Sequence, residues 1–436
     1  MSRHATKRDK SATGRADTAE NQASELALDL LLTLYIMISI QQRELAGGAR
    51  RAARTAGRLA SVIGTIGVAV ALASPAHAFI NASDFGAKGD GSDATASIQA
   101  AINSVGPTGD TVYLPAGTYT VSAPIEISHM LGVRIVGDGV NATIIQPTAA
   151  VAGQPVIQFI DSRHSTVENL SVMGLPGNPP SAGIESDSVS GGESTHLTLK
   201  DISVGSDAAD SLADGVKFAA QSGADYNNDE GFFENVVITN FTHAGYSILH
   251  SNSLIHTIIG GVISNGPIGI YTQGGSIKAV GTHFANLSEV AFDFENPVSP
   301  AIYEHPQVIA GISTEGAAAL LRTGAASVMV TITGIDGKFV QQTNPVIDFQ
   351  SNGGMLFLSN SFMNYANANS EVNFAGGAVV NLTNNYMGAS KVVLNGRMMS
   401  QANCWMGRPQ INLSRGSVVI ESGELCGSLK RARGRG

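Results

Sequence analysis

Short apolar runs that return at a nearly constant spacing are the feature that most limits how this chain can fold. The runs HTIIGGV and KAVGTHF end at Val262 and Phe284, and neighbouring runs place Ile248, Ile270 and Phe292 at two further steps of 22 residues. Each run is too short to bury its apolar face alone, so successive units must stack as the coils of a solenoid. Leucine-rich repeats have a similar period, but their Leu-x-x-Leu-x-Leu pattern is absent. The spacing therefore predicts a parallel β-helix.

Alternation along these runs predicts which side chains face the interior of a coil. The predicted inward set is Tyr246, Ile248, His250, Ile268, Ile270, Thr272, Val290, Phe292 and Phe294, and the predicted outward set is Ser247, Leu249, Gly269, Tyr271, Ala291 and Asp293. If the sheet that carries them lines a groove, Tyr271 and Asp293 are exposed in it and are candidates for substrate binding. The alternative is that both are ordinary surface residues.

The first folded segment predicts a cover for one end of the solenoid. DFGAKGDGSDATASIQAAI, residues 84–102, contains three glycines within six residues and then an apolar stripe of Ala94, Ile98, Ala101 and Ile102 at helical spacing. Asp93 is a suitable N-cap for this helix. We expect a short amphipathic helix that covers the apolar core at the open end of the coils.

The same segment, followed by VYLPAGTYTVSAPIEI, resembles the N-terminal signature of the pectate lyase superfamily, in the rhamnogalacturonase and epimerase-like branch that also includes phage tailspike depolymerases. The resemblance covers residues 82–145 and implies a single-stranded right-handed parallel β-helix with a short N-terminal capping helix. It also implies a protein that acts on polysaccharide chains. One departure is that the family usually has two adjacent acids before the helix, whereas here the second is Ala94.

The regular spacing of apolar runs is interrupted at residues 207–234, where charged residues are densest. This segment contains seven acidic residues and a single lysine. An insertion on a rigid scaffold is a reasonable place for function. Asp229 and Glu230 with Asp214 could supply the acid and the base or nucleophile of a glycosidase, and Lys217 could act as the base of a lyase. The alternative is a solvated acidic loop without chemistry.

The same insertion contains a weak calcium pattern. Asp225, Asn227 and Asp229 resemble the start of an oxygen-ligand loop. The glycine expected at the sixth position is Glu230, so calcium is a possible cofactor and no cofactor is certain.

Two classes of function follow. The first is an enzyme, a polysaccharide lyase or a glycoside hydrolase, and the second is a non-catalytic carbohydrate-binding or envelope-structural β-helix protein. The polygalacturonase motif set and the Asp-Pro-His motif of alginate epimerases are both absent. The acidic insertion and the resemblance favour the enzyme.

Residues 1–78 have the composition of an export leader. RRAARTAGR, residues 50–58, is basic, LASVIGTIGVAVALA is apolar, and Ala76 and Ala78 form the small-residue cleavage pattern. Cleavage after Ala78 leaves one β-helix domain, residues 79–429, and a basic disordered tail, residues 430–436. There is also an earlier apolar run, residues 26–40: either it is an unusual leader, or the true start of the chain lies downstream, at Met37.

The charge of the exported chain excludes one class of partner. Residues 1–78 hold ten of the 26 basic and six of the 35 acidic residues, so the remainder carries a formal net charge of −13. Such a chain does not bind nucleic acid through a basic face. We expect a polysaccharide partner, no membrane contact in the mature form, and a periplasmic, extracellular or cell-surface location.

The only two cysteines, Cys404 and Cys426, are 22 residues apart, which equals the coil step. Residues one coil apart in a parallel β-helix lie about 4.8 Å apart, within the Cα range that a disulfide tolerates. Export to an oxidising compartment permits the bond. We expect a disulfide between the last two coils.

Overall fold

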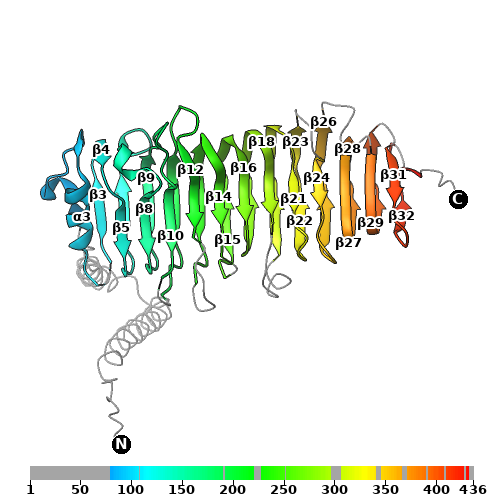
Figure 1. Cartoon of the computed structure of the whole chain (residues 1–436), viewed down its shortest axis with the longest axis horizontal. Coiled ribbons are helices and arrows are strands. Elements are labelled where there is room, and N and C mark those ends of the chain that lie inside the picture. The colour runs from blue at the N-terminus through cyan, green and yellow to red at the C-terminus, as the bar shows by residue number, and fades with distance from the viewer. Residues whose placement is uncertain are drawn as a thin grey trace, which may run out of the picture. The chain divides into compact units, whose positions relative to one another are not determined.

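The structure of the protein is a computed structural model, and it describes residues 79–107, 109–189, 192–219, 227–250, 252–295, 306–339, 345–365, 371–388, 391–406, 409–426 and 429–431. The predicted leader lies outside these residues. Within them the regular secondary structure is almost entirely β-strand, and every strand pairing is parallel. Figure 1 shows the strands side by side along one axis, from α3 at one end to β32 at the other. The predicted all-β parallel helical architecture is confirmed.

The strands form three stacks, each contributing about one strand to every coil. The first stack contains β5 (Ile125–Ser128), β8 (Pro155–Ile160), β10 (Ala182–Asp187), β12 (Leu212–Phe218), β14 (Phe241–Ile248), β16 (Val262–Thr272), β18 (His283–Phe294), β21 (Leu321–Thr323), β24 (Ile347–Phe349), β27 (Glu371–Thr383), β29 (Lys391–Gln401), β31 (Gln410–Leu413) and β33 (Lys430–Arg431).

The second stack contains β1 (Phe79–Asn81), β3 (Thr111–Leu114), β6 (Arg134–Gly137), β9 (Thr166–Val172), β11 (Thr198–Val204), β13 (Phe232–Thr239), β15 (His256–Ile259), β17 (Ile277–Val280), β19 (Gln307–Ala310), β22 (Met329–Thr333), β25 (Met355–Ser359) and β32 (Val418–Ser422). The third contains β2 (Asp90–Asp93), β4 (Gly117–Val121), β7 (Thr143–Pro147), β20 (Ser313–Ala317), β23 (Asp336–Phe339), β26 (Phe362–Tyr365), β28 (Tyr386–Gly388) and β30 (Cys404–Met406). Long strands bend and belong to two stacks. The C-terminal ends of β9, β11 and β13 and the N-terminal ends of β16 and β18 continue the third stack between β7 and β20. The C-terminal ends of β27 and β29 continue the second stack between β25 and β32.

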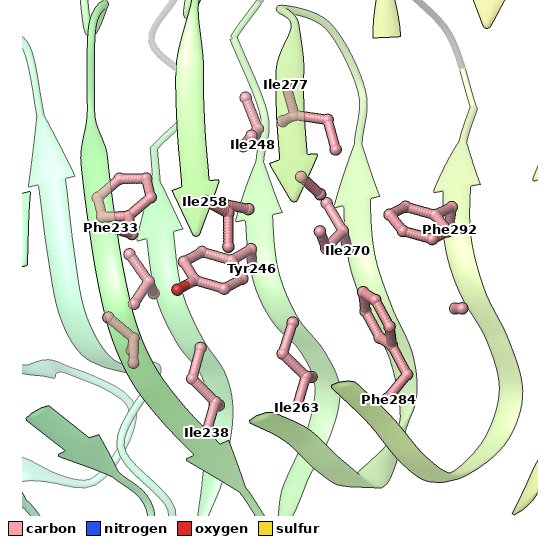
Figure 2. Packing of buried hydrophobic residues seen from close by; sticks show 14 of the residues in the cluster. Phe233, Ile238, Tyr246, Ile248, Ile258, Ile263, Ile270, Ile277, Phe284 and Phe292 are labelled. Carbon is pink, nitrogen blue, oxygen red and sulfur yellow. The ribbon is translucent and has the colours of Figure 1, made fainter. Parts of the chain in front are cut away.

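Apolar side chains from all three stacks fill the interior in rows that run from coil to coil. Tyr246, Ile270 and Phe292 form one such row, and Ile263 and Phe284 lie in the next (Figure 2). All five are buried. Burial of about 25 cal/mol for each Å² of apolar surface makes these rows the main stabilising contribution to the coils.

The predicted step of 22 residues is right for one pair of coils and wrong for the next. Ile270 pairs with Phe292, as predicted, but Ile270 pairs with Tyr246 rather than with Ile248, which pairs with Thr272. The step between β14 and β16 is therefore two residues longer than that between β16 and β18. Alternation cannot detect this, because a shift of two residues leaves every side chain on the same face.

The helix α3 (Thr95–Asn103) lies at the N-terminal end of the described coils (Figure 1). Its predicted stripe of Ala94, Ile98, Ala101 and Ile102 is buried in the main core. Its N-cap is Ala94 rather than the predicted Asp93, although the Asp93 carboxylate still accepts the Thr95 N–H at 3.0 Å. Asp93, one residue before the N-cap, therefore accepts a hydrogen bond from a backbone N–H of the first turn that has no partner within the helix.

The glycines before this helix have positive φ, which glycine adopts more readily than other residues. Gly86 ends the short 3-10 helix η2 (Ala82–Phe85) at φ 97°, and Gly89 and Gly91 also have positive φ. A second 3-10 turn, η3 (Ala149–Val151), lies between β7 and β8. No helix within the described ranges is long and apolar enough to cross a membrane.

The C-terminal coils contain the disulfide. Cys404 and Cys426 are joined, with Cα atoms 4.8 Å apart. Beyond them, β33 pairs Lys430 and Arg431 with β31, so the coil continues two residues past the predicted domain end at 429. The rest of the predicted tail, residues 432–436, lies outside the described residues.

Candidate functional site

A kink in the first stack decides which side chains face outward. A β-carbon built on Gly215, Gly245 or Gly269 would lie 2.3, 2.5 or 2.7 Å from core atoms of Ile238, Ile263 and Phe284, so these positions face the interior. The next residue along each strand faces inward as well. Two successive inward positions break the alternation, and only glycine or a small residue fits the first of them.

The kink overturns four predicted orientations. Gly269 and Ala291, predicted to face outward, face the core. Ile268 and Val290, predicted to face inward, belong to a separate apolar cluster against which Tyr271 packs. Simple alternation fails here because the strand bends where one sheet face turns into the next.

Beyond the kink, alternation resumes and produces one outward-facing row of polar side chains. Consecutive partners in the parallel register make up this row, here called the outward ladder: Glu126, Gln158, Glu185, Lys217, Ser247, Tyr271, Asp293, Arg322, Asp348 and Asn373. Tyr271 and Asp293 are neighbours in it, as their shared outward direction predicts. Asp293 is not exposed, however, because only 1% of its surface is accessible.

The most concentrated chemistry on the ladder surrounds Arg322. Its Nη2 and Nε donate to Asp293 Oδ2 at 2.5 and 3.1 Å, and both Nη atoms lie 3.2 Å from Glu289 Oε2. Glu295 Oε1 lies 3.9 Å from Nε. Three carboxylates therefore share one guanidinium, and two of them, Glu289 and Glu295, have side chains that are nearly half exposed.

Two of these groups, Glu289 and Arg322, line a small pocket. It has a volume of about 140 Å³ and is lined by Glu289, Val290, Ala319, Arg322, Pro345 and Asp348. A larger hollow of about 730 Å³ lies beside α3, at the Glu126 end of the ladder. We place the candidate site at the smaller pocket because the ionisable groups converge there.

Glu295 and Glu289, the two exposed carboxylates, have different surroundings. Burial raises the pKa of Glu295, the negative charge of Asp293 raises it further, and Arg322 acts in the opposite direction. Glu289 Oε2 accepts hydrogen bonds from both Nη atoms of the Arg322 guanidinium. The site therefore offers one carboxylic acid that retains its proton to higher pH and one carboxylate held beside a cation, the arrangement that acid–base catalysis requires.

A second group of ionisable side chains lies one to three coils from Asp293, toward the N-terminus. His243 Nδ1 lies 2.7 Å from Asp214 Oδ1, and the His243 ring meets the edge of Tyr271 with ring centroids 5.0 Å apart. The hydrogen bond to Asp214 raises the pKa of His243, and burial raises that of Tyr271.

The four predicted catalytic residues are divided among three networks. Asp214 binds His243, and Lys217 donates to the buried carboxylate of Glu185, with Nζ 2.8 Å from Oε2. Both lie on β12, in the first stack. The Lys217 amine is thus in an ion pair with Glu185.

Asp229 and Glu230 lie elsewhere, in the turn before β13 in the second stack. Asp229 Oδ1 accepts the Leu254 N–H at 2.6 Å, and Glu230 pairs with His196. The structure therefore does not bring the predicted acid pair to Asp214, because strand β12 and the turn before β13 belong to different faces of the coil.

The predicted calcium ligands are described only in part. Asp225 lies outside the described residues, and Asn227 Oδ1 already accepts the Asp229 N–H at 3.0 Å. Among the described residues, no group of three or more His, Cys, Asp or Glu side chains could hold a metal ion.

Sequence reasoning did not select Glu289, Glu295, Arg322 or His243. One signal was available: SEVAFDFEN contains three acids within seven residues in an otherwise charge-poor chain. Their common partner, Arg322, follows only 27 residues after the last of them, and no local pattern links it to them.

The first part of the β-helix matches a known protein family. Residues 79–288 match the family described as rhamnogalacturonase A/epimerase, pectate lyase-like. This segment resembles the pectate lyase-like β-helix family. Within the pectate lyase-like segment lie Asp214, Lys217, His243 and Tyr271, whereas the groups around Arg322 follow it.

Curated proteins with similar sequences match this chain only over a short stretch. The mannuronan C5-epimerase AlgE2 of Azotobacter vinelandii is 51% identical over 73 residues, which cover 15% of this chain and 7% of that protein. A probable glucan endo-1,3-beta-glucosidase of Arthroderma benhamiae is 43% identical over 90 residues, covering 18% and 10%. The chain thus spans far less than two thirds of these relatives.

Solved structures share the fold over a greater length. The catalytic unit of a GH87 alpha-1,3-glucanase from Streptomyces thermodiastaticus aligns with a TM-score of 0.50 and 15% identity, covering 81% of this chain and 69% of that one. The pre-mature gene product 12 of bacteriophage phi29 aligns at 0.50 and 13%, covering 78% and 52%. At such identities the likeness concerns architecture alone.

Proposed function

We propose that this protein is an exported glycoside hydrolase that cleaves a polysaccharide lying against the outward ladder. Its relatives by sequence include a mannuronan epimerase and a probable glucosidase, which supports action on polysaccharide. We further propose that the coils form a single-stranded right-handed β-helix, with α3 as the cap of its N-terminal end.

The observation that carries the reaction is the shared guanidinium. Glu289 lies 3.2 Å from the Nη atoms of the Arg322 guanidinium, and Glu295 lies 3.9 Å from its Nε. Their oxygens are therefore separated by no more than about 9 to 10 Å, which includes the range that lets an inverting glycosidase place a water between acid and base.

Each group then has a role that its environment supports. Glu295, with its raised pKa, protonates the glycosidic oxygen as the leaving group departs. Glu289 acts as the base that activates water. Asp293 is buried and holds the Arg322 guanidinium in place, which makes it a positioning residue.

Elimination is the second candidate, and one contact favours it: the His243–Asp214 pair beside Tyr271. A lyase needs a base that removes a proton from the sugar ring. The pKa shifts of both His243 and Tyr271 favour their protonated forms, so they suit an acid better than a base at neutral pH. We therefore place hydrolysis first.

Incubating the protein with a panel of polysaccharides tests the proposal. New reducing ends without ultraviolet-absorbing unsaturated products are expected for a hydrolase. Unsaturated products would show a lyase instead. Retention on a polysaccharide without any product would support the non-catalytic carbohydrate-binding alternative.

A further inference from the structure

The charges of the candidate site limit the polysaccharides that can lie against it. Glu289, Asp293, Glu295 and Asp348 surround a single guanidinium, that of Arg322. Even if Glu295 keeps its proton, the group carries a net negative charge. An anionic polymer approaching this pocket meets repulsion that the partly buried setting screens less than bulk water does.

The cations of the outward ladder cannot offset this repulsion, because both are already paired. Lys217 Nζ lies 2.8 Å from Glu185 Oε2, and Arg322 contacts Asp293 and Glu289. A uronate carboxylate would have to compete with these carboxylates for a cation. On the described part of the ladder no lysine or arginine is left over for it.

The hydrogen-bonding groups of the site also favour an uncharged ligand. Asp293 is 1% exposed, and its Oδ1 accepts no hydrogen bond. On the same ladder, Ser247 Oγ is buried and also has no partner. The exposed acceptors beside Asp293 are the Glu289 and Glu295 carboxylates, which can accept from a sugar hydroxyl, whereas a uronate carboxylate has no proton to donate to them.

We propose that the ligand of this site is an uncharged polysaccharide, bound through its hydroxyl groups, and not a polyuronate. This inference rests on the proposed function for the location of the site. It departs from what the name of the mannuronan epimerase relative would suggest, and the reason is the charge of this chain's own residues.

Affinity gel electrophoresis tests it without relying on turnover. Native gels cast with neutral probes (dextran, galactomannan, xyloglucan and laminarin) are compared with gels cast with polygalacturonate and alginate. We expect retardation by at least one neutral probe and none by the polyuronates. Equal or stronger retardation by a polyuronate, or none by any neutral probe, would overturn the inference.

A charge reversal supplies the matched variant. Asp348→Lys removes a negative charge from the pocket, and Glu315→Lys makes the same change on the exposed face of β20, in the third stack. We expect polygalacturonate to retard Asp348→Lys about three- to tenfold more strongly than Glu315→Lys. Equal behaviour of the two variants would show that net charge, not this pocket, excludes polyuronates.

The two proposals fail in different ways. Retardation by a neutral probe without any hydrolysis would refute the hydrolase and leave the ligand class standing. Hydrolysis of a polyuronate would refute the ligand class and leave the hydrolase standing.

Discussion

Arg322 directs two of its nitrogens, Nη2 and Nε, at a single carboxylate oxygen of Asp293, at 2.5 and 3.1 Å. The two residues are register partners on β21 and β18, separated by 29 positions along the chain. Asp293 is buried while Arg322 is partly exposed, so the carboxylate anchors the guanidinium from beneath and the guanidinium meets Glu289 and Glu295 above it.

Asp293→Ala should therefore destabilise the fold more than Glu289→Gln does. Removing a buried partner from an ion pair leaves the other charge without its anchor, and we expect a loss of about 1 to 3 kcal/mol in the free energy of unfolding. Glu289 is exposed, and exposed pairs contribute about 0 to 1 kcal/mol. Chemical denaturation of both variants measures the difference. Equal losses would contradict the anchoring role.

Glu295→Gln should lower turnover by at least about a hundredfold with little change in melting temperature. Because the pKa of Glu295 is raised, the wild-type rate should fall as pH rises through a value above the usual range of a glutamate, where the acid loses its proton. This limb should vanish in the variant. Asp229→Asn and Glu230→Gln, in the second stack, are the controls and should keep their turnover. If these controls lose activity and Glu295→Gln does not, the active site lies in the predicted insertion, residues 207–234, and not beside Arg322.

His256 should make the protein less stable in acid. Its ring is buried, Nδ1 accepts the Gly231 N–H at 3.1 Å, and burial lowers its pKa to about 3. The unfolded chain binds this proton near pH 6.5, so the folded state loses up to about 1.4 kcal/mol for each pH unit between pH 6.5 and 3. His256→Gln should reduce that slope by about one proton. An NMR titration that finds His256 protonating near pH 6 would contradict the prediction.

The Cys404–Cys426 disulfide should stabilise the last coils. Closing a loop of this length contributes about 3 kcal/mol in the chain-entropy model. We expect reduction, or Cys404→Ala, to lower the melting temperature and to raise hydrogen exchange first in β30 to β32. Peptide mapping of non-reduced protein from the exported fraction should show the linked pair. Free thiols at both positions would refute the bond in the exported protein.

Export itself has a simple test. The basic, apolar and A-x-A segments predict cleavage after Ala78, so N-terminal sequencing of the exported protein should begin at Phe79. An exported protein that starts upstream of Leu59 would be incompatible with this leader.

The sequence by itself determined the features that depend on neighbouring residues. The stripe on α3, the positive φ of Gly86 and the inward direction of Ile270 and Phe292 follow from helical spacing, from the absence of a β-carbon and from alternation. The disulfide spacing also followed, since it needs only a step of one coil between Cys404 and Cys426. These are local or periodic properties, and the sequence displays them directly.

Only the tertiary structure decided which coils stand in register and which outward residues meet. The connections between strands differ in length, so Tyr246 rather than Ile248 pairs with Ile270, and alternation cannot detect a shift of two. The kink at Gly269 exchanges inward and outward positions for steric reasons that involve Phe284, from the next coil. Asp293 and Arg322 become neighbours because the coil between them has the right number of residues. No sequence motif indicates this number, and therefore none indicates that one guanidinium lies among three carboxylates.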